Sequence, residues 1–327
     1  MVHLLNRTPL AAIEFNDDNG KHLRVFCQSP QGDIIEVLYD QKGGWKGPSK
    51  YVVGRGKLNT GIAAISSPDG KHIRVYFLDE HYRIVERVYK GHSGGLLGGV
   101  SDSNPWTDGP LTGKFHAAPY SRLGAICLDK GEQLRVFFQD KSNKLKELIY
   151  KENQGWKEST SKLPTALAGT SIAAAHNPDH EYRGQMWLYF QSPELKLQEI
   201  SNNGKDDNWK EGSFKSNKVY PPTCGIAVIM GCNPIKIAVV AVDENNMLVE
   251  TRFDNGWKST IDIRESTITD SDVALISLEN SKGSHVQSAT SAEKIDLRLF
   301  FQPAGSNIGE MVSEDGSHWK LTHENVF

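Results

Sequence analysis

The stretch that decides the fold is HLRVFCQSPQGDIIEVLYDQKGGW, residues 22–45. Two strand-like runs, rich in β-branched and aromatic residues, flank a polar turn at residues 29–33, a pattern typical of a β-hairpin. An arginine (Arg24) precedes a glutamate (Glu36) by twelve residues, and a tryptophan (Trp45) follows. The even spacing places the cation and the anion on the same face of a sheet.

The opening phrase recurs along the whole chain, which predicts a repeat architecture. Its copies are LRVFCQSP (23–30), IRVYFLDE (73–80), LRVFFQDK (134–141), MWLYFQSP (186–193), IAVVAVDE (237–244) and LRLFFQPA (297–304). Each copy follows a small-residue apolar run such as LAAIEF and precedes a second amphipathic run. Each repeat then closes on a tryptophan: Trp45, Trp106, Trp156, Trp209, Trp257 and Trp319.

Each repeat predicts four short strands joined by polar turns. Four-stranded units repeated around an axis are typical of a β-propeller, in which repetition protects the strand edges. We therefore expect an all-β, six-bladed β-propeller with four-stranded antiparallel blades, and the Ala- and Gly-rich first strands on the wall of a central channel. The expected single domain covers residues 1–327, with blades at about 8–59, 60–121, 122–169, 170–222, 223–270 and 271–327.

Composition limits the partners and the compartment. The net charge is −3 and like charges do not cluster, so nothing favours a nucleic-acid partner. No secretory signal or membrane-spanning run is visible, so we expect no membrane insertion. The expected location is the cytoplasm, or the cell or spore surface by a non-classical route. Four cysteines without CxxC spacing indicate buried apolar residues rather than disulfides or zinc ligands: Cys27, Cys127, Cys224 and Cys232. We expect neither a metal nor another cofactor.

Arginine and glutamate recur at the same twelve-residue spacing in four repeats. The pairs are Arg24 and Glu36, Arg74 and Glu86, Arg135 and Glu147, and Arg298 and Glu310. The fourth and fifth repeats keep the glutamate (Glu199, Glu250) but have Trp187 and Ala238 at the arginine position. If the hairpin turn is centred midway, the two side chains lie directly opposite each other, with Cβ atoms about 5 Å apart.

Two interpretations of the pair remain open at this point. One is a cross-strand salt bridge, worth a fraction of a kcal/mol if exposed. The other is contact with a ligand, and it is favoured for the arginine because two of the six repeats lack it. The glutamate occurs in all six repeats, so a structural share is open for it. Forked guanidinium donors, a carboxylate acceptor and an indole face together suit a neutral polyol with one apolar side, which describes a sugar.

A family resemblance rests on these phrases. The repeated pattern IRVYxQ…I.E…Y…GW, behind an AAI strand, resembles the fungal fucose-binding lectins typified by the Aleuria aurantia lectin. The stretches FHAAPYSRLGAICL (115–128) and LRVFFQDKSNKLKELIYKENQGWKES (134–159) look closer to the Aspergillus fucose-specific lectins. The resemblance implies a non-catalytic, multivalent lectin, usually a homodimer, that binds α-L-fucose of fucosylated glycans between neighbouring blades.

In that family, arginine and glutamate come from one blade, and a tyrosine and the closing tryptophan come from the next. The first cleft then contains Arg24, Glu36, Tyr89 and Trp106. The second contains Arg74, Glu86, Tyr150 and Trp156. The third contains Arg135, Glu147 and Trp209, with Asn202 at the tyrosine position. The ring closes where Arg298 and Glu310 meet Tyr39 and Trp45. The clefts at Trp187 and Ala238 depart from the pattern, as does the long stretch 91–106 before Trp106.

Two other classes compete with a lectin. A sialidase-type propeller would carry repeated Asp-boxes, and SEDGSHW (313–319) is a single loose approach to one. P-loop and HExxH motifs are absent from the sequence, and we expect no enzyme. A protein-interaction scaffold is the general alternative, because a fold alone does not determine function. A flat protein interface, however, would not repeat the same polar set at a fixed spacing.

Overall fold

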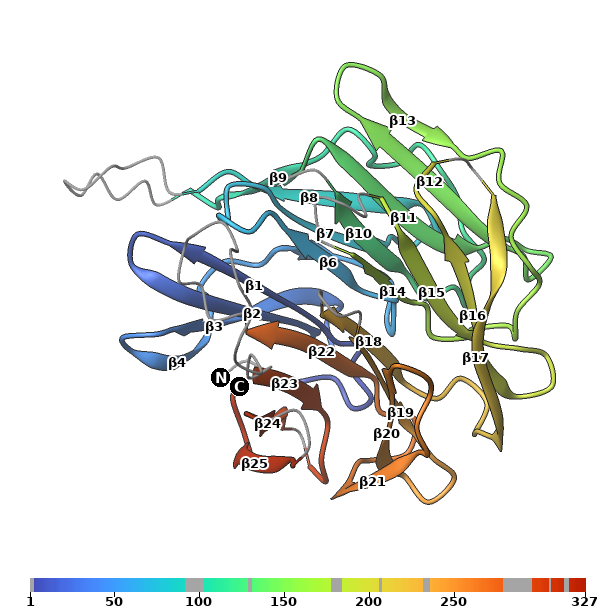
Figure 1. Cartoon of the computed structure of the whole chain (residues 1–327). Coiled ribbons are helices and arrows are strands. Elements are labelled where there is room, and N and C mark those ends of the chain that lie inside the picture. The colour runs from blue at the N-terminus through green and yellow to red at the C-terminus, as the bar shows by residue number, and fades with distance from the viewer. Residues whose placement is uncertain are drawn as a thin grey trace, which may run out of the picture.

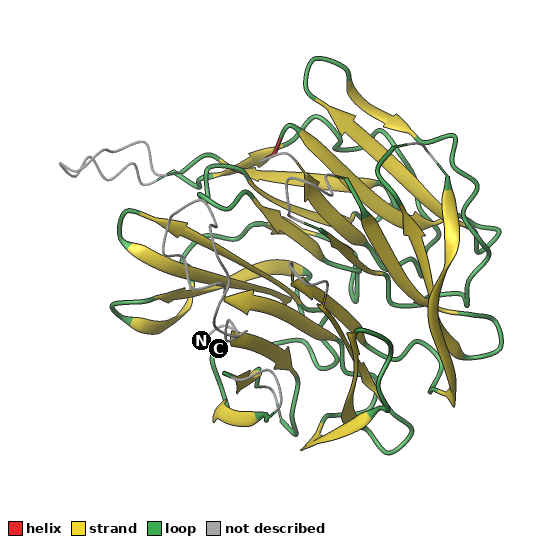
Figure 2. Cartoon of the chain, viewed as in Figure 1, coloured by secondary structure: helices red, strands yellow, loops and turns green. Residues whose placement is uncertain are grey.

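The computed structural model describes residues 3–91, 103–128, 131–177, 184–205, 208–231, 236–278, 296–305, 307–314 and 318–327. Strands joined by short loops make up nearly all of the described chain (Figure 2). They form six antiparallel sheets, each with a four-strand path in chain order. The prediction of a six-bladed, all-β propeller is therefore confirmed.

The strands of the first three blades have the following bounds. Blade one contains β1 (Ala11–Asp17), β2 (Gly20–Gln28), β3 (Asp33–Asp40), β4 (Gly44–Pro48) and a short extra strand on β3, β5 (Gly54–Arg55). Blade two contains β6 (Ala63–Ser66), β7 (Ile73–Leu78), β8 (Ile84–Tyr89) and β9 (Trp106–Asp108). Blade three contains β10 (Gly124–Leu128), β11 (Gln133–Gln139), β12 (Leu145–Lys151) and β13 (Gly155–Glu158).

The other three blades repeat this order. Blade four contains β14 (Ala173–His176), β15 (Met186–Gln191), β16 (Lys196–Asn202) and β17 (Trp209–Val219). Blade five contains β18 (Ile226–Gly231), β19 (Lys236–Val242), β20 (Met247–Asp254) and β21 (Ile261–Ser266). Blade six contains β22 (Val273–Leu278), β23 (Asp296–Phe301), β24 (Gly309–Ser313) and β25 (Lys320–His323). That the six blades form one domain with the limits given above stays a prediction.

The first strand of each blade lies at the centre of the ring. Each contacts the first strand of the next blade, and β1 contacts β22, which closes the circle (Figure 1). Residues of all six first strands line an axial cavity of about 120 Å³. Small side chains are needed there, because a Cβ added to Gly124 would lie 2.7 Å from the carbonyl oxygen of Ile172 in the next blade. This crowding explains the Ala- and Gly-rich runs in the sequence.

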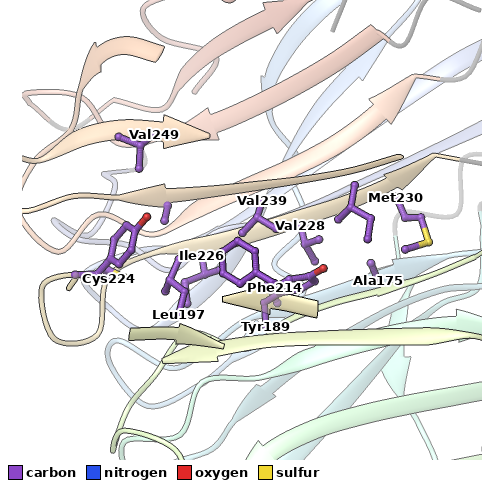
Figure 3. Close-up of a cluster of buried hydrophobic side chains, with 14 residues drawn as sticks. Ala175, Tyr189, Leu197, Phe214, Cys224, Ile226, Val228, Met230, Val239 and Val249 are labelled. Carbon is purple, nitrogen blue, oxygen red and sulfur yellow. The ribbon is translucent and has the colours of Figure 1, made fainter. Parts of the chain in front are cut away.

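The hydrophobic core lies between neighbouring blades. Figure 3 shows one such layer, where side chains of blades four and five interdigitate. Tyr189 and Phe214 of blade four pack against Val228 and Val239 of blade five, and all four are buried. Because each blade buries a face against both neighbours, the blades depend on one another for stability.

In four blades, a buried glutamine of the repeated phrase forms hydrogen bonds with the segment that leads into the next blade of the ring. Gln139 donates a hydrogen bond from Nε2 to the Leu167 carbonyl (3.0 Å) and accepts one from the Gly169 amide (2.9 Å). Gln28 and Gln191 make equivalent contacts. Gln302 makes them with the N-terminal segment, accepting from the Thr8 amide (3.1 Å) and donating to the Leu5 carbonyl (3.3 Å).

The prediction that the cysteines are buried apolar residues agrees with the structure for two of the four. Cys27 and Cys224 are buried free thiols, and burial raises the pKa of Cys224 to about 12. Cys127 is partly exposed, and Cys232 lies outside the described residues. Within the described part of the chain, no helix is long and apolar enough to cross a membrane.

Candidate functional site: the clefts between blades

The register of the hairpin in blade one differs from the sequence prediction. Arg24 pairs with Leu38, and Glu36 pairs with Phe26, so the cation and the anion are diagonal neighbours rather than directly opposite. The reason is the turn: residues 29–33 form a five-residue loop whose centre lies one residue later than the midpoint of the pair. Diagonal neighbours lie about 7–8 Å apart, which the long arginine side chain spans.

The same diagonal arrangement recurs in the other three blades that contain both residues. The opposite partners are Val88 for Arg74, Ile149 for Arg135 and Val312 for Arg298. Each arginine contacts its glutamate, with closest distances of 3.4 Å in blade one, 2.6 Å in blade two, 3.1 Å in blade three and 2.8 Å in blade six.

These ion pairs are not exposed salt bridges. The arginine side chains are 10–17% exposed and the glutamate side chains 0–6% exposed. A partly exposed guanidinium over a buried carboxylate offers donors to the cleft. The carboxylate is costly to leave without its cation.

The second cleft shows how the next blade completes the set. The guanidinium carbon of Arg74 lies 5.5 Å from the ring centroid of Tyr150, a cation–π contact across the blade boundary. Tyr150 packs on Trp156, and Trp156 meets Tyr76 edge-on with 6.0 Å between centroids. The structure thus brings together the four residues that the sequence assigns to this cleft.

The closing cleft joins the two ends of the chain. Trp45 Nε1 donates a hydrogen bond to Glu310 Oε2 (3.3 Å), across 265 positions of sequence. Arg298 Nη1 contacts the other oxygen of Glu310, and Tyr39 packs on Trp45 with 5.3 Å between centroids. His323 adds a further contact to the Glu310 carboxylate. All four residues predicted for this cleft therefore lie together.

The third cleft has the indole but a smaller wall. Trp209 Nε1 donates to Glu147 Oε2 (3.3 Å), as Trp45 does at the closing cleft. Asn202 occupies the tyrosine position and pairs with Trp209 in register. Its side-chain amide donates to the Asn208 carbonyl (3.1 Å) and so turns back on its own hairpin.

The first cleft includes Trp106 despite the long preceding stretch, of which residues 92–102 lie outside the described part of the chain. Trp106 pairs in register with Tyr89, and their rings pack with 5.2 Å between centroids. Trp106 also meets Phe26 edge-on, with 6.0 Å between centroids. Burial raises the pKa of Tyr89, the Glu36 charge adds to this effect, and the Arg24 guanidinium opposes it. The predicted set is assembled here too.

The fourth cleft replaces the cation with apolar surface. Trp187, at the arginine position, packs against the core cluster between blades four and five. Glu199 accepts hydrogen bonds from the Tyr189 hydroxyl and from the Ser213 amide (2.9 Å) instead of an arginine. Trp257 Nε1 donates to Ser213 Oγ (3.0 Å) rather than to the glutamate. Blade four shows that the fold accommodates this glutamate without a cation.

The fifth cleft contains an arginine that the sequence analysis missed. Arg252 lies directly opposite Ala238 in register and reaches Glu250 with two hydrogen bonds of 2.7 Å, from Nε and Nη2. Trp319 Nε1 donates to Glu250 Oε2 (2.9 Å). Aligning repeats by position hid Arg252, because an aliphatic residue occupies the same position in four other blades. A check of the residue two positions after each glutamate would have found it.

Burial raises the pKa of the glutamates in the first and third clefts. Burial raises the pKa of Glu36 to about 7, against the opposing effects of the Arg24 guanidinium and the Trp106 indole. Burial likewise raises the pKa of Glu147, and Arg135 and Trp209 oppose it. Among the described residues, no group of three or more His, Cys, Asp or Glu side chains is arranged to hold a metal ion.

The whole chain also matches known proteins. The family described as "Fungal fucose-specific lectin" matches residues 4–326. The chain belongs to this family. A fucose-specific lectin of Aspergillus oryzae is 34% identical over 311 residues, covering 91% of this chain and 88% of that one. The fucose-specific lectin of Aleuria aurantia is 25% identical over 339 residues, covering 98% and 96%.

Solved structures support the fold of this lectin. An Aleuria aurantia lectin mutant in complex with α-methyl-L-fucoside superposes with a TM-score of 0.80 at 22% identity, covering 99% of this chain and 96% of that one. A protein of Arthrobotrys oligospora superposes with a TM-score of 0.80 at 24% identity, covering 98% and 86%.

Replacing the Glu36 carboxyl in this lectin should raise stability at high pH. The folded-state pKa of about 7 exceeds the usual glutamate pKa of 4.5, so the folded chain binds the proton more tightly. The stabilising contribution is complete below pH 4.5 and is lost as pH rises through 7. We expect Glu36→Gln to melt about 3–5 °C above the parent at pH 8 and level with it at pH 5. A gap independent of pH, measured by calorimetry, would contradict the assignment.

Removing the arginine should cost more stability in blade one than in blade two of the lectin. Glu86 keeps two other donors, the Tyr76 hydroxyl (3.2 Å) and the Leu111 amide (2.9 Å), whereas Phe26 replaces that tyrosine beside Glu36. At pH 8, Arg24→Met should lower the melting temperature by about 5–10 °C and Arg74→Met by about 2 °C. Equal shifts in the two variants would show that the extra donors do not compensate.

Proposed function

We propose that this lectin binds α-L-fucose at four inter-blade clefts, the first, second, third and closing ones. Membership of the family supports recognition of fucosylated glycans. The observation that carries the assignment is the recurrence of a partly exposed guanidinium over a buried carboxylate, faced by an indole of the next blade. The residues are Arg24, Glu36, Tyr89 and Trp106; Arg74, Glu86, Tyr150 and Trp156; Arg135, Glu147 and Trp209; and Arg298, Glu310, Tyr39 and Trp45.

Each group has a separate task in recognition. The guanidinium donates to ring hydroxyl oxygens through its fixed fork, and the carboxylate accepts a hydroxyl proton. The tyrosine and tryptophan rings offer an apolar wall to the C–H face and the methyl group of the deoxy sugar. Binding then requires no bond to form or break, which agrees with a carbohydrate-binding family rather than a sialidase-type hydrolase.

Calorimetric titration with methyl α-L-fucoside tests the number of sites. We expect four equivalents per chain, the weakest at the third cleft because Asn202 replaces the aromatic wall there. Asn202→Tyr should strengthen that cleft by about fivefold, since an aromatic contact is worth roughly 1 kcal/mol. A stoichiometry of six, or fucose bound beside Trp187, would show that the arginine is dispensable.

We also propose that two chains associate as a homodimer, which the family resemblance supports, and light scattering in solution tests this. The location stays a prediction as well. Labelling intact and broken cells with an antibody would separate a cytoplasmic protein from one at the cell or spore surface.

A further inference from the structure

The fifth cleft differs from the other clefts in two ways. Its arginine comes from β20 instead of β19, and a cavity lies beside that arginine. The small side chain of Ala238 removes the bulk that an arginine fills in four other blades, and Gly231 lies diagonal to it on the neighbouring strand β18. A cavity of about 190 Å³ opens at this place, between blades five and six. Figure 1 shows β18, β19 and β20 beside β22 and β23, the strands that supply its walls.

Glu250 is held by its arginine through two nitrogens in this cleft. Its two oxygens receive three hydrogen bonds, two from Arg252 and one from Trp319, and its side chain is fully buried. In the second and closing clefts, by contrast, the arginine reaches its glutamate through a single terminal nitrogen, Nη1. The fifth cleft therefore orients its arginine differently from the second and closing clefts.

The cavity presents a different set of groups. Arg252 donates hydrogen bonds to Glu250 from Nε and Nη2. Because the guanidinium is planar, its third nitrogen, Nη1, points away from that carboxylate. Arg252 also lines the cavity, where Lys236 and Asp254 face each other in register across β19 and β20. Ile229 and Leu297 form an apolar wall beside Ala238. The site thus combines cationic donors, one carboxylate acceptor and a small apolar recess.

An acetamido group matches this set. Its carbonyl oxygen accepts from a guanidinium or ammonium group, its N–H donates to a carboxylate, and its methyl group fills a small apolar recess. We propose that the fifth cleft binds a 2-acetamido sugar, with Arg252 and Lys236 donating to the acetamide carbonyl, Asp254 accepting its N–H, and Ala238 providing the space. The inference rests on the proposed function only in that the ligand is a sugar.

The probe is methyl N-acetylglucosaminide, with methyl glucoside as the control that lacks the acetamide. Saturation-transfer NMR on the full chain should show contact at the acetamide methyl group, unchanged when methyl α-L-fucoside saturates the other clefts. Calorimetry should give one equivalent per chain. Methyl glucoside should bind at least about tenfold more weakly.

Variants separate the fifth cleft from the rest. Ala238→Trp copies the residue of blade four and fills the cavity, so acetamido-sugar binding should fall at least about tenfold while four fucose equivalents remain. Arg252→Leu, the residue type found at position 38 in blade one, should have the same effect on binding. The double variant Ala238→Arg with Arg252→Leu restores the blade-one pattern, and it should lose the acetamido sugar and gain a fifth fucose equivalent.

Several results would overturn the assignment. One is no binding of the acetamido sugar at about 10 mM by a chain that still binds four fucosides, which leaves the proposed function intact. Another is acetamido-sugar binding that Ala238→Trp and Arg252→Leu leave unchanged. A third is a fifth fucoside in the parent chain that Arg252→Leu removes. A folded chain that binds neither sugar would refute the proposed function itself.

Discussion

Fucose binding should disappear when Arg24, Arg74, Arg135 and Arg298 are replaced together by methionine. Each replacement removes charged donors, which make hydrogen bonds about twice as strong as neutral ones. With about 1.5–3 kcal/mol lost per charged hydrogen bond, the affinity of each cleft should fall by about 10²-fold or more. Titration with methyl α-L-fucoside measures this directly, and the expected change is from four equivalents to none.

Loss of fucose binding identifies the arginines as ligand-binding residues only if the quadruple variant is still folded. Because each glutamate is buried, the arginine variants should be compared with a set that also replaces the facing residue by glutamine: Glu36, Glu86, Glu147 and Glu310. Neutral partners remove the cost of a buried unpaired charge, so this octuple variant should melt higher than the quadruple one. If the octuple variant is folded and still binds fucose, the arginines are structural and the site assignment is wrong.

The number of fucose sites per chain should affect binding to a fucosylated surface more strongly than the affinity of any single cleft does. In a series that keeps one, two, three or four arginines, each remaining cleft should bind free methyl fucoside with the affinity that it has in the parent chain. On a densely fucosylated surface the chain with four sites should bind about 10²–10⁴-fold more tightly than the chain with one. Surface plasmon resonance at matched protein concentration gives this ratio.

The same series has a simple cellular readout. Agglutination of fucosylated cells requires at least two sites on one particle, so the one-site chain should fail to agglutinate unless it dimerises. Free fucose should reverse agglutination by the four-site chain. Equal surface affinity across the series would mean that the clefts cannot engage neighbouring glycans at the same time.

The periodic features of the fold could be predicted from the sequence. A phrase repeated six times specifies six blades, and small residues such as Gly124 mark the strands nearest the axis. The pairing of Arg74 with Glu86 followed from their spacing, and the structure places them in contact. That these residues bind fucose stays a prediction.

Features that depend on three-dimensional packing could not be predicted. The turn at residues 29–33 moved Glu36 away from the position opposite Arg24, because loop length is not encoded in the spacing of two residues. The burial of each arginine–glutamate pair depends on how closely the next blade packs against it. The spacing of the two residues in the sequence therefore does not predict that the glutamates are buried. Arg252 replaces a missing arginine from the facing strand, which a comparison limited to the arginine position of each repeat cannot detect.

The contacts of Gln302 with Leu5 and Thr8 have a consequence for synthesis. A chain made from its N-terminus completes the other clefts as successive blades emerge, since their two walls are neighbours in sequence. The cleft of Trp45 and Glu310 instead waits for residues separated by 265 positions. A product released before its last blade would lack this cleft, and its first blade would have no partner on one side. If this cleft binds a sugar, its occupancy marks a chain that contains the sixth blade.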